Sequence, residues 1–252
     1  MENLIGSTRN EGNALPNWGV IGTIIWSLII FSVFIIIQVI TIIASALKNE
    51  QALNDEQLRD FFVSSVSDGG IISVSTLLTT VICCALIAAV IKLKRGSTLT
   101  DYLAIKAVPF RTLLFWLAGM SAFIAASDAL TVLLGRPVVP PVSAAMYVTA
   151  HPVWILWVAL VIAAPLFEEM FFRGFLFKGL ASSRIGPIGA ITLTAIFWAM
   201  IHTQYDAYLI GTIFCMGLLF GAARLQTGSI LVPLVLHAFT NIVSTVETAL
   251  LS

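Results

Sequence analysis

The chain has 252 residues, of which 59% are hydrophobic and only 10% are charged, with a formal net charge of +0. Its mean hydropathy is +1.00. A soluble domain carries about 25% charged residues, so this composition excludes an ordinary soluble domain and predicts a polytopic membrane protein. The balanced charge offers no basic surface to a polyanion, so we expect no nucleic-acid partner.

The apolar runs of the chain predict an all-α fold, a polytopic membrane helix bundle of about seven transmembrane helices. A helix needs about 20 mostly apolar residues to cross the hydrocarbon core of a bilayer. Runs of this kind lie at 18–47, 71–91, 112–135, 152–178, 188–203, 207–224 and 229–251. The first run exceeds the roughly 7–15 apolar residues of a signal peptide, so we expect it to stay as a membrane anchor.

Three regions follow from this pattern. Residues 1–17 are polar and predict a solvated N-terminal tail. Residues 18–150 predict an N-terminal transmembrane region in which intramembrane polar groups are scarce. Residues 151–252 predict a second helix bundle, and nearly all candidate functional side chains fall in it.

Lysine and arginine predict the orientation, because short loops rich in these residues stay on the cytoplasmic side. The loop 92–111 is rich in basic residues, whereas the loop 48–70 holds more acidic than basic ones. We therefore expect an integral, multi-pass protein of a bacterial-type cell membrane with a cytoplasmic N-terminus. The segment 101–111 mixes apolar and basic residues, which fits a short amphipathic surface helix and an ordinary loop equally well.

The fourth apolar run carries two adjacent glutamates, Glu168 and Glu169, followed by Arg173. Each such charge at the bilayer centre costs about 2.5–3.5 kcal/mol, whereas a Leu, Ile, Phe or Val returns only about 0.3–0.6 kcal/mol. Pro165 lies just before the pair and lacks a backbone donor, so we expect it to interrupt the helix. Irregular backbone at this depth is typical of a cavity lining, and the three charges therefore predict a functional site.

Helix geometry predicts different roles for the two carboxylates. Glu169 and Arg173 are four residues apart, so they share a helix face and can form an ion pair. Glu168 points about a third of a turn away, which leaves its carboxylate free for general-base chemistry. The competing interpretation is a buried ion-pair network that only fixes helix packing, although buried ion pairs are weak stabilisers.

Two histidines and an asparagine lie on later predicted helices. His202 closes the fifth run, and His237 and Asn241 share a face of the seventh. A single membrane histidine is commonly satisfied by a hydrogen bond between helices. Polar groups on three separate helices are satisfied together when they converge on one cavity, so we expect Glu168 to meet these three residues.

Residues of these types suit amide hydrolysis. A carboxylate and a histidine can activate a water, while a second histidine and an asparagine amide can donate hydrogen bonds to the developing oxyanion. A zinc site is the alternative, with Glu168, His202 and His237 as ligands, because one glutamate and two histidines form a known zinc ligand set. The chain lacks the His-Glu-x-x-His motif that specifies zinc by close spacing, so the sequence leaves a metal cofactor open.

The motifs resemble those of the CPBP family of intramembrane proteases, named for CAAX proteases and bacteriocin processing, which includes the type II CAAX prenyl endopeptidase. The family's first motif, Glu-Glu-x-x-x-Arg, matches Glu168, Glu169 and Arg173. Its second motif, Phe-x-x-x-His, matches at His202, but Trp198 occupies the aromatic position.

The third family motif, His-x-x-x-Asn/Asp, matches His237 and Asn241. The three motifs together cover roughly residues 165–245, and the first 150 residues carry no comparable signature. Each motif is short, but three in order on three predicted apolar helices are a specific signal. By this resemblance, 151–252 would be a CPBP-like catalytic helix bundle.

The resemblance implies an intramembrane endopeptidase that hydrolyses peptide bonds of membrane-associated or prenylated-type peptides. By analogy, Glu168 and His202 would activate the water, and His237 and Asn241 would form the oxyanion hole. Glu169, paired with its arginine, would support the site. Members of the family have been described as metalloproteases, while a metal-free, glutamate-activated mechanism fits its eukaryotic-type members, so zinc stays an alternative.

Other functions are compatible with the same residues. A non-proteolytic membrane scaffold or regulator of the immunity type would use the cavity to hold a partner, although a scaffold needs no paired oxyanion donors. A small transporter with Glu168 as a proton relay is less favoured, because the chain shows no inverted repeat. The expected partners are the lipid bilayer and a membrane peptide or protein substrate.

Overall fold

The computed structural model describes residues 16–47 and 55–251 of the chain. Six helical segments in this part are long and apolar enough to cross a membrane, and α10 (Gly186–Met200) is apolar but only 15 residues long. The six are α1 (Gly19–Leu47), α3 (Gly69–Leu93), α5 (Phe110–Leu133), the composite Val153–Ala181, α11 (Ala207–Thr227) and α12 (Leu231–Leu251). The predicted all-α bundle of about seven spans is therefore confirmed.

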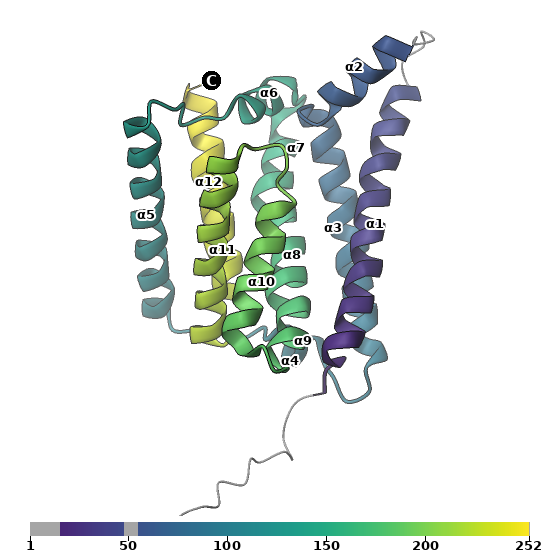
Figure 1. Cartoon of the computed structure of the whole chain (residues 1–252), viewed down its shortest axis with the longest axis vertical. Helices are drawn as coiled ribbons and strands as arrows, with labels where there is room; N and C mark the ends of the chain where they lie inside the picture. Colours follow the sequence, from purple (N-terminus) through teal and green to yellow (C-terminus); the bar gives the residue numbers. More distant parts are fainter. Residues whose placement is uncertain (1–15, 48–54, 252) are drawn as a thin grey trace, which may run out of the picture.

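The apolar segments run alternately up and down the bundle, so that α1 starts at the lower end and α12 finishes at the upper end (Figure 1). Short helices occur in the connections, namely α2 (Asp55–Ser65), α4 (Leu99–Leu103) and α6 (Pro141–Thr149). The loop predicted over 48–70 thus contains a helix, and its first residues lie outside the described part. The segment 101–111 forms no continuous surface helix, because residues 104–109 are non-helical between α4 and α5.

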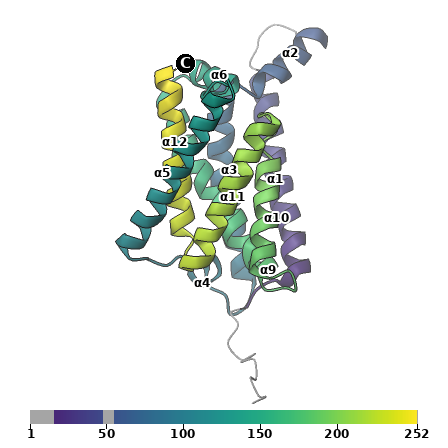
Figure 2. The ribbon, with the colours of Figure 1, turned by 60° about the vertical axis from the view of Figure 1, so that its left-hand side comes forward.

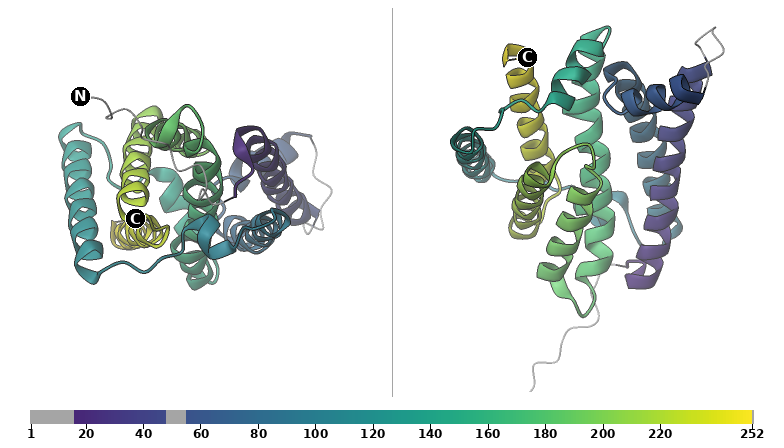
Figure 3. Two further views of the ribbon diagram at one scale, coloured as in Figure 1. Left: turned by 90° about the horizontal axis from the view of Figure 1, so that it is seen from below. Right: turned by 45° about the horizontal axis from the view of Figure 1, so that its top comes forward.

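The helices of the second half lie between two flanks. α1 and α3 pack against each other on one side, and α5 stands on the other side (Figures 1 and 3). The upper half of α5 approaches α12, while its lower end stands away from the other helices (Figure 2). Within α5 only Met120 and Thr131 are buried. One wall of the bundle is therefore a helix that is largely open to its surroundings.

Two glycines bring α11 close to α10. A Cβ on Gly217 would lie 3.0 Å from the Cβ of Ala195, and one on Gly221 would lie 2.6 Å from a methyl carbon of Ile191. The small-xxx-small spacing of these glycines therefore serves close packing of the two helices. This approach also brings the backbone carbonyl of Gly217 within reach of the buried Arg173.

The fourth crossing is one continuous helix, although Pro165 was expected to interrupt it. It consists of α7 (Val153–Val158), η2 (Ala159–Ala163), α8 (Ala164–Glu168), η3 (Glu169–Leu176) and α9 (Phe177–Ala181). The two η segments are π-helical, so each backbone hydrogen bond there spans five residues instead of four. The chain accommodates the proline by widening the helix rather than breaking it, and Glu168 and Glu169 lie at the junction where the second widening begins.

The fifth crossing is shorter than expected. The sequence pattern predicted a span over 188–203, but α10 ends at Met200, and His202 lies in the non-helical connection that follows. In Figure 1 this connection lies below the upper end of α12. The early helix end lets the backbone turn beside the fourth crossing, and irregular backbone of this kind is tolerated where it lines a cavity.

Candidate active site

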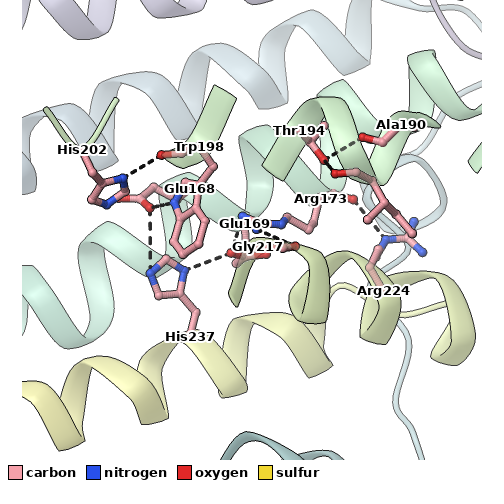
Figure 4. Close-up of polar contacts among 11 residues, drawn as sticks. Glu168, Glu169, Arg173, Ala190, Thr194, Trp198, His202, Gly217, Arg224 and His237 are labelled. Atoms are coloured by element: carbon pink, nitrogen blue, oxygen red, sulfur yellow. Dashed lines mark hydrogen bonds and ion pairs between the residues drawn. The ribbon is translucent and has the colours of Figure 1, made fainter. Parts of the chain in front are cut away.

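A cavity of about 360 Å³ opens between α5, the fourth crossing, α11 and α12. Four of the six predicted site residues line it: Glu168, His202, His237 and Asn241. The other two predicted residues, Glu169 and Arg173, lie behind its wall and are fully buried. The structure therefore brings together all the residues that the motifs singled out. Figure 4 shows these residues with the exception of Asn241.

Arg173 and Glu169 form the buried ion pair that their spacing predicts. Nη1 of Arg173 donates to Oε1 of Glu169 at 3.0 Å, and Nη2 donates to the carbonyl of Gly217 at 3.3 Å. The guanidinium lies 4.7 Å from the ring centroid of Trp198 and 5.3 Å from that of Phe220. A carboxylate, a carbonyl and two aromatic faces thus surround the buried charge, which compensates for its lost hydration.

His237 connects the two glutamates. Its Nδ1 atom lies 3.0 Å from Oε1 of Glu169, and its Nε2 atom lies 3.9 Å from Oε2 of Glu168. An ionised carboxylate only accepts hydrogen bonds, so Nδ1 of His237 carries a proton and donates a hydrogen bond to Glu169. Glu169 therefore does more than neutralise the arginine, because it also sets the tautomer and orientation of the imidazole, as the acidic member of a hydrolase triad does.

The carboxylate of Glu168 has a donor that the sequence pattern did not predict. The indole N–H of Trp198 donates a hydrogen bond to Oε2 of Glu168 (Figure 4). The phenylalanine of the family motif has no such donor, so this contact follows from the departure at Trp198. A carboxylate offers about four lone-pair sites on its two oxygens, which leaves acceptor capacity on Glu168 for a water.

Trp198 also orients His202. Nδ1 of His202 lies 2.7 Å from the backbone carbonyl of Trp198, and the two rings meet edge to face with centroids 5.3 Å apart. A carbonyl only accepts, so Nδ1 carries the proton and Nε2 carries the lone pair. His202 can therefore accept a proton at Nε2, which suits the role predicted from the motif.

Asn241 fills a gap in the backbone hydrogen bonds of the fourth crossing. Its Nδ2 donates to the carbonyl of Leu160 at 2.7 Å. In the π-helical segment η2 this carbonyl would need a donor five residues on, at Pro165, which has no N–H. Ala164, four residues on, donates to Ala159 instead. The amide of Asn241 thus holds α12 against the widened helix, and its second N–H is left for another acceptor.

Two further acids line the cavity. The carboxyl groups of Asp128 on α5 and Glu247 on α12 lie close enough to interact with each other. No local pattern links these residues, because they lie on helices far apart in the sequence. Trp198, by contrast, was visible as a departure from the family motif, although its bond to Glu168 was not.

Over 16–47 and 55–251, no group of three or more His, Cys, Asp or Glu residues is placed to hold a metal ion, so we derive no step through a metal. The hydrogen bonds at Nδ1 of His202 and His237 nevertheless leave Nε2 of each ring available, as in a zinc-binding histidine. The zinc alternative with Glu168, His202 and His237 therefore stays a prediction for elemental analysis to test.

The fold and the site together define an integral, multi-pass membrane protein with a buried cluster of glutamate and histidine at a cavity. Residues 150–243 match the family model described as type II CAAX prenyl endopeptidase Rce1-like. The matched segment runs from the start of the fourth crossing into α12 and contains all six predicted site residues. The resemblance predicted from the motifs is thereby confirmed for this segment. Neither a curated protein nor a solved structure matches the chain.

Proposed function

We propose that the protein is an intramembrane endopeptidase that hydrolyses peptide bonds of membrane-associated or prenylated-type peptides. The observation that supports this most is the convergence of Glu168, His202 and His237 on one cavity. All three lie in the segment that matches a family of prenyl endopeptidases. A carboxylate beside an imidazole with a free Nε2 is suited to take a proton from water.

The proposed reaction begins with a water bound between Glu168 and Nε2 of His202. Glu168 takes a proton from this water, whose oxygen then attacks the carbonyl carbon of the scissile peptide bond. A tetrahedral intermediate forms, with the negative charge on the former carbonyl oxygen. The proton held by Glu168 passes to the leaving nitrogen, the C–N bond breaks, and a carboxylic acid and an amine are released.

The oxyanion requires hydrogen-bond donors from the other side of the cavity. The second N–H of Asn241 is one candidate, because the first is engaged by the carbonyl of Leu160. Nε2 of His237 can donate only when both ring nitrogens are protonated, since Nδ1–H already points to Glu169. One oxyanion donor typically contributes about 2.7–4 kcal/mol.

The cavity also constrains how a substrate arrives. Its lining includes Phe123, Ile124 and Asp128 of α5, the helix that is largely open to its surroundings. A peptide held in the bilayer can therefore approach beside α5 without crossing the bundle core. This arrangement supports a membrane-associated substrate, and an apolar prenyl group could remain in the lipid while the peptide enters the cavity.

The test is cleavage of a prenylated peptide and of a membrane-anchored peptide by the protein reconstituted in vesicles. The variant Glu168→Gln keeps the size of the side chain and its ability to accept the indole hydrogen bond, but it removes the base. We expect it to fold and to lose cleavage of both substrates. Glu56→Gln, an exposed position on α2, is the matched control and should cleave normally. Full activity of Glu168→Gln would show the mechanism to be wrong.

The same preparation also separates the endopeptidase from the alternative functions. A scaffold or regulator would retain a bound partner with no cleaved product detectable by mass spectrometry. A transporter would give substrate-dependent proton flux and no hydrolysis. Cleavage that depends on Glu168 supports the endopeptidase over both.

A further inference from the structure

A buried guanidinium lies near the lower end of the bundle, away from the cavity. Arg224 is in the last turn of α11 and is only 7% exposed. Its Nε donates to the backbone carbonyl of Arg173 at 3.1 Å, and its guanidinium lies 5.3 Å from the ring centroid of Phe177. It forms no ion pair with a carboxylate of the described residues. Buried charges are ordinarily paired with an opposite charge, so we expect an anion to bind beside the Arg224 guanidinium.

One lysine lies near this guanidinium, and a second lysine lies near the first. Lys178 directly follows the phenylalanine that Arg224 contacts, and the charges of both Arg224 and Lys106 act on it. Lys106 is fixed beside the end of α11 because the hydroxyl of Ser229 donates to its backbone carbonyl at 2.5 Å. The carboxylate that also acts on Lys178 is that of Asp101, which accepts a hydrogen bond from a threonine hydroxyl. Lys178 thus lies near two other cations and near one carboxylate that is already hydrogen-bonded.

The position of this group suits a lipid headgroup. It lies at the end of the bundle where α4 and α9 are found (Figure 1). Of the described acidic residues, only Asp101 lies at this end. Most of the described lysines and arginines gather here, namely Lys92, Lys94, Arg95, Lys106, Arg111, Lys178, Arg184 and Arg224. Basic pockets between transmembrane helices bind phosphate headgroups of anionic lipids, and a guanidinium matches phosphate geometry with two parallel N–H donors.

We propose that Arg224, Lys178 and Lys106 bind the phosphate of an anionic phospholipid at this end of the bundle. Nε of Arg224 is already used by the carbonyl of Arg173, so the two Nη groups are the donors left for phosphate oxygens. The lysines add charge beside them. The lipid supplies the anion that the buried guanidinium lacks.

The site is connected to the proposed active site through a short series of contacts. Arg224 donates to the backbone of Arg173, whose side chain pairs with Glu169, and Glu169 accepts from Nδ1 of His237 (Figure 4). A phosphate that holds Arg224 in place therefore also fixes the residues behind His237. We expect bound anionic lipid to raise the rate of cleavage; this consequence rests on the proposed function, whereas the binding does not.

The binding experiment uses the full chain in detergent and a fluorescent phosphatidylglycerol, with phosphatidylcholine as the neutral lipid. We expect phosphatidylglycerol to bind saturably and phosphatidylcholine not to bind. Lys178→Gln should weaken it about fivefold, since one basic residue near a membrane surface contributes roughly that factor. Arg224→Gln should weaken it further. Lys92→Gln, an exposed position at the same end of α3, is the matched control and should bind as the unmodified chain does.

Free phosphate is distinguished from lipid by adding inorganic phosphate as a competitor. Competition at millimolar phosphate would identify a site for the free anion rather than for a lipid, and would overturn the lipid assignment. Equal binding of both lipids, or unchanged binding in Lys178→Gln, would also overturn it. If Arg224→Gln does not fold, the lysine variant decides the question.

The activity experiment compares vesicles with and without phosphatidylglycerol. Cleavage that rises with phosphatidylglycerol in the unmodified chain, but not in Lys178→Gln, supports the coupling. Cleavage that is equal in both kinds of vesicle refutes the coupling and leaves the endopeptidase proposal intact. Absence of cleavage in every vesicle, together with normal lipid binding, refutes the endopeptidase proposal and leaves the lipid site intact.

Discussion

Replacement of Trp198 by phenylalanine tests the most specific feature of the site. The ring of Trp198 is 2% exposed and lies against Arg173, His202 and His237. Phenylalanine keeps an aromatic ring in this position and keeps the backbone carbonyl that orients His202. It removes the indole N–H that donates to Glu168. The substitution therefore addresses one hydrogen bond while the ring contacts are largely preserved.

The expected magnitude follows from the kind of hydrogen bond that is lost. A hydrogen bond to a charged group contributes about 1.5–3 kcal/mol. If that energy serves to hold the carboxylate of Glu168 in its reactive orientation, its loss appears in the barrier, where about 1.4 kcal/mol is tenfold in rate. We therefore expect kcat to fall about 10- to 100-fold. KM should stay nearly unchanged, because the indole N–H points to the carboxylate and not to a bound peptide.

The assay is steady-state cleavage of a membrane peptide in vesicles, with thermal unfolding measured on the same preparation. Trp154→Phe is the control, because Trp154 is 62% exposed on the outer face of the fourth crossing. It should change neither kcat nor KM. A kcat for Trp198→Phe within twofold of the unmodified chain, or a rise in KM alone, would refute the positioning role of the indole.

Further predictions concern the buried pair, the helix contact and the metal. Glu169→Gln should destabilise the fold by about 3–5 kcal/mol in unfolding experiments, because it leaves a buried guanidinium without its carboxylate. Gly221→Ala should destabilise by about 1–3 kcal/mol, since the added Cβ would lie 2.6 Å from Ile191, whereas Gly211→Ala meets no atom within 4 Å and should be neutral or stabilising. Elemental analysis of the purified protein should find zinc well below one equivalent; a full equivalent that is lost in His202→Ala would reassign the site to a metal.

Much of the fold follows from the sequence because a bilayer imposes a simple rule. Runs of about 20 apolar residues must be helices, since no other single segment satisfies its own backbone in lipid. The all-α bundle and most span positions could therefore be predicted from hydropathy. The two departures, the short α10 and the continuous helix through Pro165, concern local backbone geometry, which hydropathy does not report.

The sequence indicated which residues make up the candidate site, but it did not indicate most of the contacts between them. Spacing of four residues indicated the pair of Glu169 and Arg173, because helix geometry alone brings them together. The bonds from Trp198 to Glu168 and from Asn241 to Leu160 join different helices, and their distances depend on how those helices pack. Sequence spacing holds no information on that packing.

The sequence by itself therefore determined that this is a helical membrane protein with a set of costly intramembrane charges, and it indicated the family through three short motifs. Only the tertiary structure decided which contacts these charges make between helices. It gave Glu169 a second partner, His237, besides the predicted Arg173, and it gave Glu168 an indole donor. The physical reason is that local periodicity fixes which residues share a helix face, whereas contacts between helices arise from close packing of the whole bundle.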